Sequence, residues 1–289
     1  MFKRQKTGSV VCPSCGSLVG VNDERCYTCG RRNPGLWGFA PLLRGLGNNF
    51  GFVPLVVYGC SALYLVGLLV TVALGRNIMG GGGIFSLLSA DPFVQLAFGE
   101  SGAAPVFQLG MWWTILSAGW LHGGALHILF NMMVLRQLGP AIEDIYGGPR
   151  MVIIYTISSA CGFLLSSSAG EFMPRLPLLG GASFTLGASA AIFGLVGALV
   201  HYGRPGGGSI LRSQATSYAF SMFVFGLIMP GIDNYAHAGG FVGGYLASAW
   251  LDPLTRPRSH HIFGAAACLV LSALAIVASM VTVFPALRR

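Results

Sequence analysis

Long stretches without a single charged side chain are the feature of this sequence that most limits its fold. Residues 53–74, 187–202 and 262–283 contain no Asp, Glu, Lys or Arg. A helix of roughly 20 apolar residues crosses the ~30 Å hydrocarbon core of a bilayer. The composition, 54% hydrophobic and 9% charged, is also far from that of soluble proteins. Since runs this long satisfy their backbone only as helices, we expect an all-α polytopic membrane protein.

The alternation of apolar and polar segments predicts seven spans. They are expected near residues 53–75, 125–145, 151–168, 187–202, 214–230, 235–251 and 262–284. Short loops join the last five, so these should pack as an antiparallel bundle. Residues 76–124 are expected to form a long loop that includes Gly80–Gly83 and the pair Trp112–Trp113. The glycine run is too degenerate for a phosphate-binding loop.

Basic residues predict the orientation of these spans. Seven precede the first span, and under the positive-inside rule they place the N-terminus in the cytoplasm: Lys3, Arg4, Lys6, Arg25, Arg31, Arg32 and Arg44. Only Arg76, Arg175, Arg288 and Arg289 then lie outside. The net charge of +8 is divided among short clusters between spans, which favours a role in topology over nucleic-acid binding. We expect no cleavable signal peptide, and a multi-pass protein of a bacterial plasma membrane.

Two cysteine pairs ahead of the first span predict a metal site. Cys12 and Cys15 form one CxxC pair, and Cys26 and Cys29 form the other. Two such pairs can offer four thiolates to one tetrahedral zinc ion, and a reducing cytoplasm disfavours the alternative of two disulfides. We expect a cytosolic zinc ribbon at 1–35 with an unknown cytosolic partner, a linker at 36–52 and a membrane domain at 53–289. So small a head needs the metal to fold.

Five polar side chains stand at the edges of the apolar spans, where such residues usually face a water-filled cavity and have a function. They are His122, His127, Asn131, Ser189 and His237. Charge and hydropathy alone place all five near the outer ends of their spans. Because unrelated residues would not share one depth, we expect them to form one site.

Ser189 and His237 supply the chemistry of a nucleophile and its base. A serine hydroxyl needs a base, and histidine takes and returns a proton near neutral pH. Small residues that recur along both spans, Gly194 on one and Gly239–Gly244 on the other, allow the close approach that this pair requires. No acidic residue is placed to orient the histidine, which predicts a dyad rather than a triad.

Other members of the group have candidate roles and simpler alternatives. The Ser189 N–H and the side chains of His127 and Asn131 could stabilise an oxyanion. Taken singly, the serine could bond to its own helix, and Asn131 could join two helices. For His122 we favour a role in bracing the loop over direct chemistry.

The assembled residues resemble the rhomboid family of intramembrane serine proteases over roughly residues 50–255. Its H-x4-H-x3-N pattern is matched by His122, His127 and Asn131, and its G-x3-E-x3-G pattern by Gly139, Glu143 and Gly147. The serine motif is matched by Gly187–Gly194, and the histidine motif by Ala236–Gly240 with Gly244. This resemblance implies a six-helix bundle plus one C-terminal helix, and cleavage of transmembrane protein substrates near their outer ends.

The resemblance also implies residue roles: Ser189 is the nucleophile, His237 the general base, and His127 and Asn131 oxyanion donors. Phe193 matches the aromatic residue that packs on the histidine. Two positions depart from the family pattern. Ala190 replaces a glycine, which could narrow the space for substrate, and Trp113 replaces an arginine, so that the loop would be held by aromatic burial.

Two other functions remain open at this point. An inactive relative that binds membrane clients would keep the fold without the reaction. A transporter or channel has less support, because no ionisable residue lies mid-span between His237 and the inner ends.

Overall fold

The computed structural model describes residues 4–12, 15–40, 51–78, 87–173, 180–203, 208–229, 231–255 and 258–285. The predicted Gly80–Gly83 run and Arg175 lie outside these ranges, as do Arg44 and the last four residues. Seven helices of the described residues correspond to the predicted spans: α2 (Phe52–Ala73), α5 (Ala125–Tyr146), α6 (Gly148–Phe172), α7 (Ser189–Tyr202), α8 (Ser209–Ile228), α9 (Asn234–Trp250) and α10 (Ser259–Val283).

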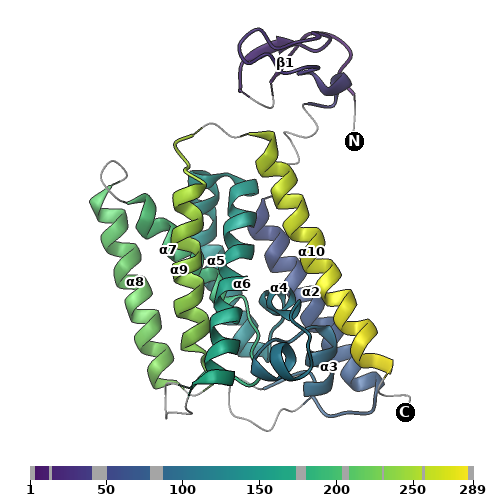
Figure 1. Cartoon of the computed structure of the whole chain (residues 1–289), viewed down its shortest axis with the longest axis vertical. Helices are drawn as coiled ribbons and strands as arrows, with labels where there is room; N and C mark the ends of the chain where they lie inside the picture. The colour runs from purple at the N-terminus through teal and green to yellow at the C-terminus, as the bar shows by residue number, and fades with distance from the viewer. Residues whose placement is uncertain are drawn as a thin grey trace.

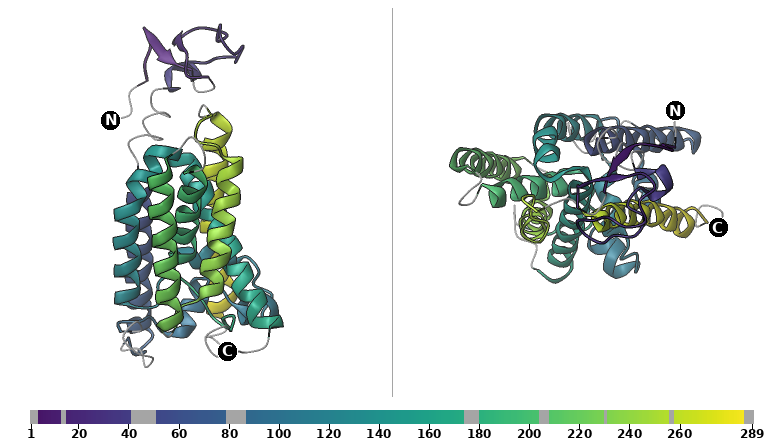
Figure 2. Two further views of the ribbon diagram at one scale, coloured as in Figure 1. Left: turned by 90° about the vertical axis from the view of Figure 1, so that its left-hand side faces the viewer. Right: turned by 90° about the horizontal axis from the view of Figure 1, so that it is seen from above.

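These helices form one elongated bundle. Among the described residues, α2, α5, α6 and α10 are long and apolar enough to cross a membrane, and α7 is a shorter apolar helix. Figure 1 shows α6, α7 and α9 side by side in the middle, with α8 at one edge and α10 at the other, and Figure 2 shows the same arrangement from two further directions. The chain is therefore a mostly helical, multi-pass membrane protein.

The long segment between α2 and α5 is more structured than the sequence predicts. It contains α3 (Pro92–Phe98), the π-helical turn η3 (Ala104–Gln108), α4 (Thr114–Ser117) and the 3-10 turn η4 (Ala118–Trp120). Asp91 caps α3, since its carboxylate accepts a hydrogen bond from the Phe93 N–H at 2.9 Å. The same carboxylate pairs with Arg76 at 2.7 Å, which ties α3 to the end of α2.

Glu143, near the end of α5, caps the start of α2. Its carboxylate accepts hydrogen bonds from the backbone N–H groups of Phe52 at 2.6 Å and Val53 at 3.4 Å. The first N–H groups of a helix have no acceptor within the helix, and a negative charge there also opposes the helix dipole. The acidic residue of the G-x3-E-x3-G pattern thus joins α5 to α2.

The N-terminal head is a small unit with one hairpin. Strand β1 (Ser9–Val11) pairs with β2 (Leu18–Gly20) in antiparallel register, Ser9 opposite Gly20, and η1 (Leu36–Gly38) follows. Its buried apolar residues are few, and two of the thiols belong to the same cluster: Val10, Cys12, Val19, Val21, Cys26 and Ala40.

Candidate active site and metal centre

Ser189 and His237 face each other at one end of the bundle. Ser189 is the first residue of α7 and His237 lies in the first turn of α9. The Ser189 Oγ lies 3.0 Å from the His237 Nε2, which is hydrogen-bond distance. The Phe193 ring, one turn along α7, stacks on the imidazole with ring centroids 4.1 Å apart and planes at 15°. The two side chains are thus positioned for proton transfer from the hydroxyl to the ring.

Helices α7 and α9 approach this closely because glycines line their contact. A Cβ at Gly240 would overlap the carbonyl of Ala190, and a Cβ at Gly244 would overlap the carbonyl of Gly194. At Gly162 of α6, a Cβ would lie 2.8 Å from that of Ala190. Backbone therefore packs directly on backbone, as the small residues along both spans predict.

Asp233 fixes the start of α9. Its side chain accepts a hydrogen bond from the Ala236 N–H at 2.9 Å, and the Ser166 hydroxyl of α6 donates a short hydrogen bond to its other oxygen. Within the described residues, the Nδ1 atom of His237 has no hydrogen-bond partner. The carboxylate thus holds the helix that carries the histidine rather than the imidazole itself.

His127 and Asn131 lie on α5 beside the serine. A Cβ at Gly187 would be 2.6 Å from the His127 Nε2 and 3.8 Å from the Ser189 Oγ, so the two side chains border the same small volume. The Asn131 side chain donates to the His127 carbonyl at 2.9 Å. As the first residue of α7, Ser189 has a backbone N–H that its own helix does not use. The His127 ring and the Ser189 N–H therefore lie around one point, with Asn131 one turn further along α5.

His122 is buried next to His127. Its ring packs edge-on against that of His127, with centroids 5.2 Å apart, and its nitrogens have no hydrogen-bond partner within the described residues. A cavity of about 20 Å³, lined in part by His122, Tyr64 and Gln95, lies next to the ring. That volume is enough for one water molecule. The contact with His127 suits the predicted bracing role.

The segment that leads into Ser189 is held by the preceding loop. Ser101 and Thr185 exchange two backbone hydrogen bonds, at 2.7 and 3.0 Å, and the Gly187 N–H donates to the Ala118 carbonyl at 3.0 Å. Burial raises the pKa of the neighbouring Glu100 carboxyl to about 8. Glu100 is therefore mostly protonated at neutral pH and adds little negative charge beside this segment.

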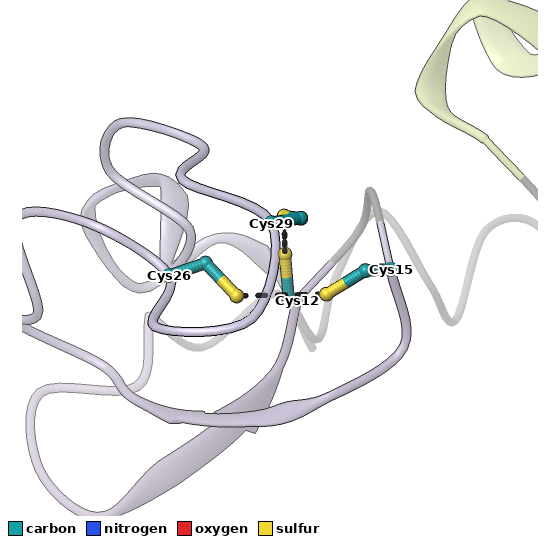
Figure 3. A group of neighbouring side chains, drawn as sticks. All are labelled: Cys12, Cys15, Cys26 and Cys29. Atoms are coloured by element: carbon teal, nitrogen blue, oxygen red, sulfur yellow. Dashed lines mark hydrogen bonds between the residues drawn. The ribbon is translucent and has the colours of Figure 1, made fainter.

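The four head cysteines converge on one point. Figure 3 shows their sulfurs pointing toward a common centre, and all four lie within 4.8 Å of one another. The Cys12 and Cys29 sulfurs are 3.8 Å apart, and those of Cys15 and Cys26 are 3.5 Å apart. Zinc–sulfur distances of about 2.3 Å in a regular tetrahedron place neighbouring sulfurs about 3.8 Å apart, so this set fits the ion.

The two halves of the cysteine cluster have the same backbone turn. The Gly16 N–H donates to the Cys12 carbonyl at 2.9 Å, and the Gly30 N–H donates to the Cys26 carbonyl at 2.8 Å. Both glycines have positive φ, 74° and 73°, which only glycine adopts without cost. Each Cys-x-x-Cys-Gly segment therefore ends with the same backbone hydrogen bond and the same glycine conformation. The cluster is consistent with a zinc site.

Comparison with known proteins shows which family the chain matches. The rhomboid domain matches residues 109–253, about half of the chain, and includes α5 to α9 with every residue of the candidate active site. The chain belongs to the rhomboid family. The resemblance inferred from its histidine, asparagine and serine motifs is thereby confirmed.

Curated relatives include a protein named as a rhomboid protease and one named as inactive. Rhomboid protease GluP of Bacillus subtilis is 33% identical over 166 residues, which cover 56% of this chain and 30% of GluP. RHOMBOID-like protein 4 of Arabidopsis thaliana is 34% identical over 150 residues, 50% of this chain and 35% of that protein. Inactive RHOMBOID-like protein 8 of the same plant is 31% identical over 135 residues, 45% and 35% of the two chains. The aligned region spans about a third of each of these relatives.

The two departures from the rhomboid pattern have structural consequences. The Ala190 side chain is fully buried against Ala118, Phe163 and Ala236, so its methyl group packs inside the bundle rather than lining the open side of the site. Trp113 is partly buried and its indole N–H donates to the Ser279 hydroxyl of α10 at 3.0 Å. A hydrogen bond to α10, together with packing, holds the loop where aromatic burial alone was expected.

Asp233 and Ser166 support the site, and Glu143 joins α5 to α2, without having been assigned a role from the sequence alone. Asp233 stands just before the helix predicted to begin at residue 235, and an Asp in that position is a capping signal that could have been recognised. The partners of Ser166 and Glu143 are 67 and 91 residues away, and local sequence gives no sign of such pairings.

Proposed function

We propose that this rhomboid protein is an intramembrane serine protease that uses Ser189 as nucleophile and His237 as general base and acid. The observation that carries the proposal is the 3.0 Å separation of the Ser189 Oγ and the His237 Nε2, with the imidazole held flat against Phe193. A nucleophile within hydrogen-bond reach of its base is the arrangement that acyl transfer requires.

The reaction follows from these positions. The Ser189 oxygen attacks the scissile carbonyl while its proton passes to the His237 Nε2, and the Ser189 N–H with the His127 and Asn131 side chains stabilises the oxyanion. The imidazolium then protonates the leaving amine. A water molecule, deprotonated by the same ring, hydrolyses the acyl-enzyme and restores the serine.

The substrates would be transmembrane segments of other proteins, cleaved near their outer ends. We propose that α7, α8 and α9 cross the bilayer with the four longer helices, giving seven spans and a cytoplasmic N-terminus. The proposed domains are a zinc ribbon at 1–35, a linker at 36–52 and the membrane domain at 53–289. Zinc would have a structural role in the head and none in catalysis.

The second candidate is a rhomboid protein that binds membrane clients without cleaving them. Ala190 in the serine motif and the relative named as inactive are the observations that keep it open. Both hypotheses require a site that admits a transmembrane segment, and they differ only in whether the peptide bond breaks.

Cleavage of a single-span reporter in membranes tests the proposal. Ser189→Ala and His237→Gln should each lower cleavage at least ~10³-fold, because each removes one partner of the proton transfer. Ser183→Ala is the matched control, since Ser183 precedes the same helix and its backbone carbonyl, not its hydroxyl, accepts the hydrogen bond from Ala104. Equal cleavage by wild type and Ser189→Ala would remove the protease assignment.

A further inference from the structure

A second cavity lies at the distal end of the bundle, which we define as the end opposite Ser189, where α5, α7 and α9 finish. It has a volume of about 330 Å³ and lies between α6, α10 and the turn that joins α9 to α10. Cavities of this size hold small ligands or parts of larger ones. Nothing in the proposed proteolytic reaction uses it.

The mouth of this distal cavity is basic. Arg258, His260 and His261 line it, and no acidic residue is among the described residues that line it. Arg258 and His260 are exposed, whereas His261 is buried and its Nδ1 accepts a hydrogen bond from the Arg258 N–H at 3.3 Å. Asp252 lies on the same turn, where its carboxylate accepts from the Leu254 N–H at 2.9 Å.

A further guanidinium reinforces this positive charge from inside the protein. Arg150, at the start of α6, is only 3% exposed and donates to both the carbonyl and the hydroxyl oxygen of Thr255, at 2.8 and 3.0 Å. Thr255 itself lines the cavity. Arg150 therefore anchors the wall and adds positive potential behind it, with Asp252 as the nearby acidic group that interacts with it.

The rest of the cavity is apolar and faces the outside of the bundle. Ile153, Leu251 and Cys268 form its inner wall, and the Trp250 side chain at its edge is 77% exposed. Phe263, one turn into α10, is 71% exposed. Exposed tryptophan beside basic residues at the end of an apolar helix is typical of the membrane interface.

We propose that the distal cavity binds an anionic phospholipid, with the phosphate at Arg258, His260 and His261 and the first part of an acyl chain along the apolar wall. Basic pockets between transmembrane helices suit anionic head groups, because the phosphate accepts charge-assisted hydrogen bonds from cationic side chains such as Arg258. Arginine also matches the geometry of phosphate oxygens. A free phosphate ion would use the same mouth but leave the apolar wall unused, so the lipid is the occupant that fits both parts.

Native mass spectrometry of the delipidated full-length protein tests this site. Phosphatidylglycerol and phosphatidylcholine with identical acyl chains are compared on wild type, on the double variant Arg258→Gln with His260→Gln, and on Arg212→Gln. Both substituted cavity residues are exposed, so the double variant should fold. Arg212 is the matched control because it is an exposed basic residue at the same end, on α8 and outside the cavity lining.

Wild type and Arg212→Gln should bind phosphatidylglycerol roughly tenfold more tightly than phosphatidylcholine, because the choline cation next to the phosphate of the latter is repelled by the basic mouth, and the double variant should lose that preference. Millimolar inorganic phosphate should not displace the lipid. Equal binding of both lipids, or an equal loss in Arg212→Gln, would overturn the site, and displacement by phosphate would identify a free anion as the ligand instead. Cleavage activity does not enter this test, so its outcome is independent of the proposed protease function.

Discussion

The head and the bundle of this protein hold their reactive side chains in place by different means. In the head, two short turns bring four sulfurs within 4.8 Å of one another around a very small apolar cluster. In the bundle, glycines let the backbones of α7 and α9 touch, so that Ser189 and His237 lie within hydrogen-bond distance. The head therefore relies on four thiols that could bind a metal ion, whereas the bundle relies on glycines, which have no side chain.

A bulky side chain placed in the contact between α7 and α9 should have the largest effect on cleavage. Gly240→Leu places a side chain against the Ala190 carbonyl, which separates the helices and should reduce reporter cleavage to background, since overpacking costs about 1 to 3 kcal/mol or more. Val242→Leu adds bulk on the same helix where the side chain is 54% exposed, and should cleave normally. Cleavage by Gly240→Leu within twofold of wild type would show that this contact does not position the dyad.

Removing the metal should unfold the head and leave the bundle unchanged. Cys12→Ser, or treatment with a chelator, takes away one ligand or the ion, and the head should lose its fold because its apolar cluster is too small to hold it. Zinc release and proteolysis of residues 1–40 measure whether the head is folded. Cleavage of the reporter measures whether the bundle is intact. Cys268→Ser, at the far end of the chain, should retain zinc. A head that resists proteolysis without metal would contradict this difference between the regions.

A smaller effect is expected at the start of α9. Asp233→Ala removes the helix cap and the contact with Ser166, which should cost about 1 kcal/mol of stability and lower cleavage several-fold, because His237 sits one turn later. Asp252→Ala removes a similar side chain-to-backbone hydrogen bond just beyond the other end of the same helix. Thermal unfolding and reporter cleavage should separate the two variants, with cleavage lowered only in Asp233→Ala.

The smallest effect, on thermal stability alone, is expected from removing the hydrogen bond between the loop and α10. Ser279→Ala removes the acceptor of the Trp113 indole N–H and should cost about 0.5 to 1.5 kcal/mol. Ser272→Ala, on the same helix, removes a buried hydroxyl that has no hydrogen-bond partner within the described residues. A thermal shift no larger in Ser279→Ala than in Ser272→Ala would mean that α10 does not brace the loop through this bond.

The sequence predicted the helices well because their signal is physical and local. A long, mostly apolar segment has few explanations other than a buried or membrane-spanning helix, so the spans predicted at residues 125–145 and 235–251 lie within one residue of α5 and α9. The third span was predicted too short, since α6 continues to Phe172 through serines and Glu171 that lower its hydropathy.

The elements between α2 and α5 were missed for the opposite reason. Helices as short as α3 and α4 leave no measurable periodicity, although Asp91 followed by Pro92 is a recognisable helix start. The proximity of Ser189, His237 and His127 was predictable from the expected topology, which places all three near the same ends of their spans. The long-range bonds of Glu143 and Ser166 were not, because each depends on how distant helices pack.

The central claim is that Ser189 is a nucleophile activated by His237. Labelling with a serine-directed fluorophosphonate, followed by peptide mass spectrometry, tests it most directly, because the modified residue is identified without any choice of substrate. The account predicts modification of Ser189 in the wild type, none in Ser189→Ala, and much slower labelling in His237→Gln, since the hydroxyl is then without its base. An unlabelled Ser189 in folded protein, or an unchanged rate in His237→Gln, would contradict it.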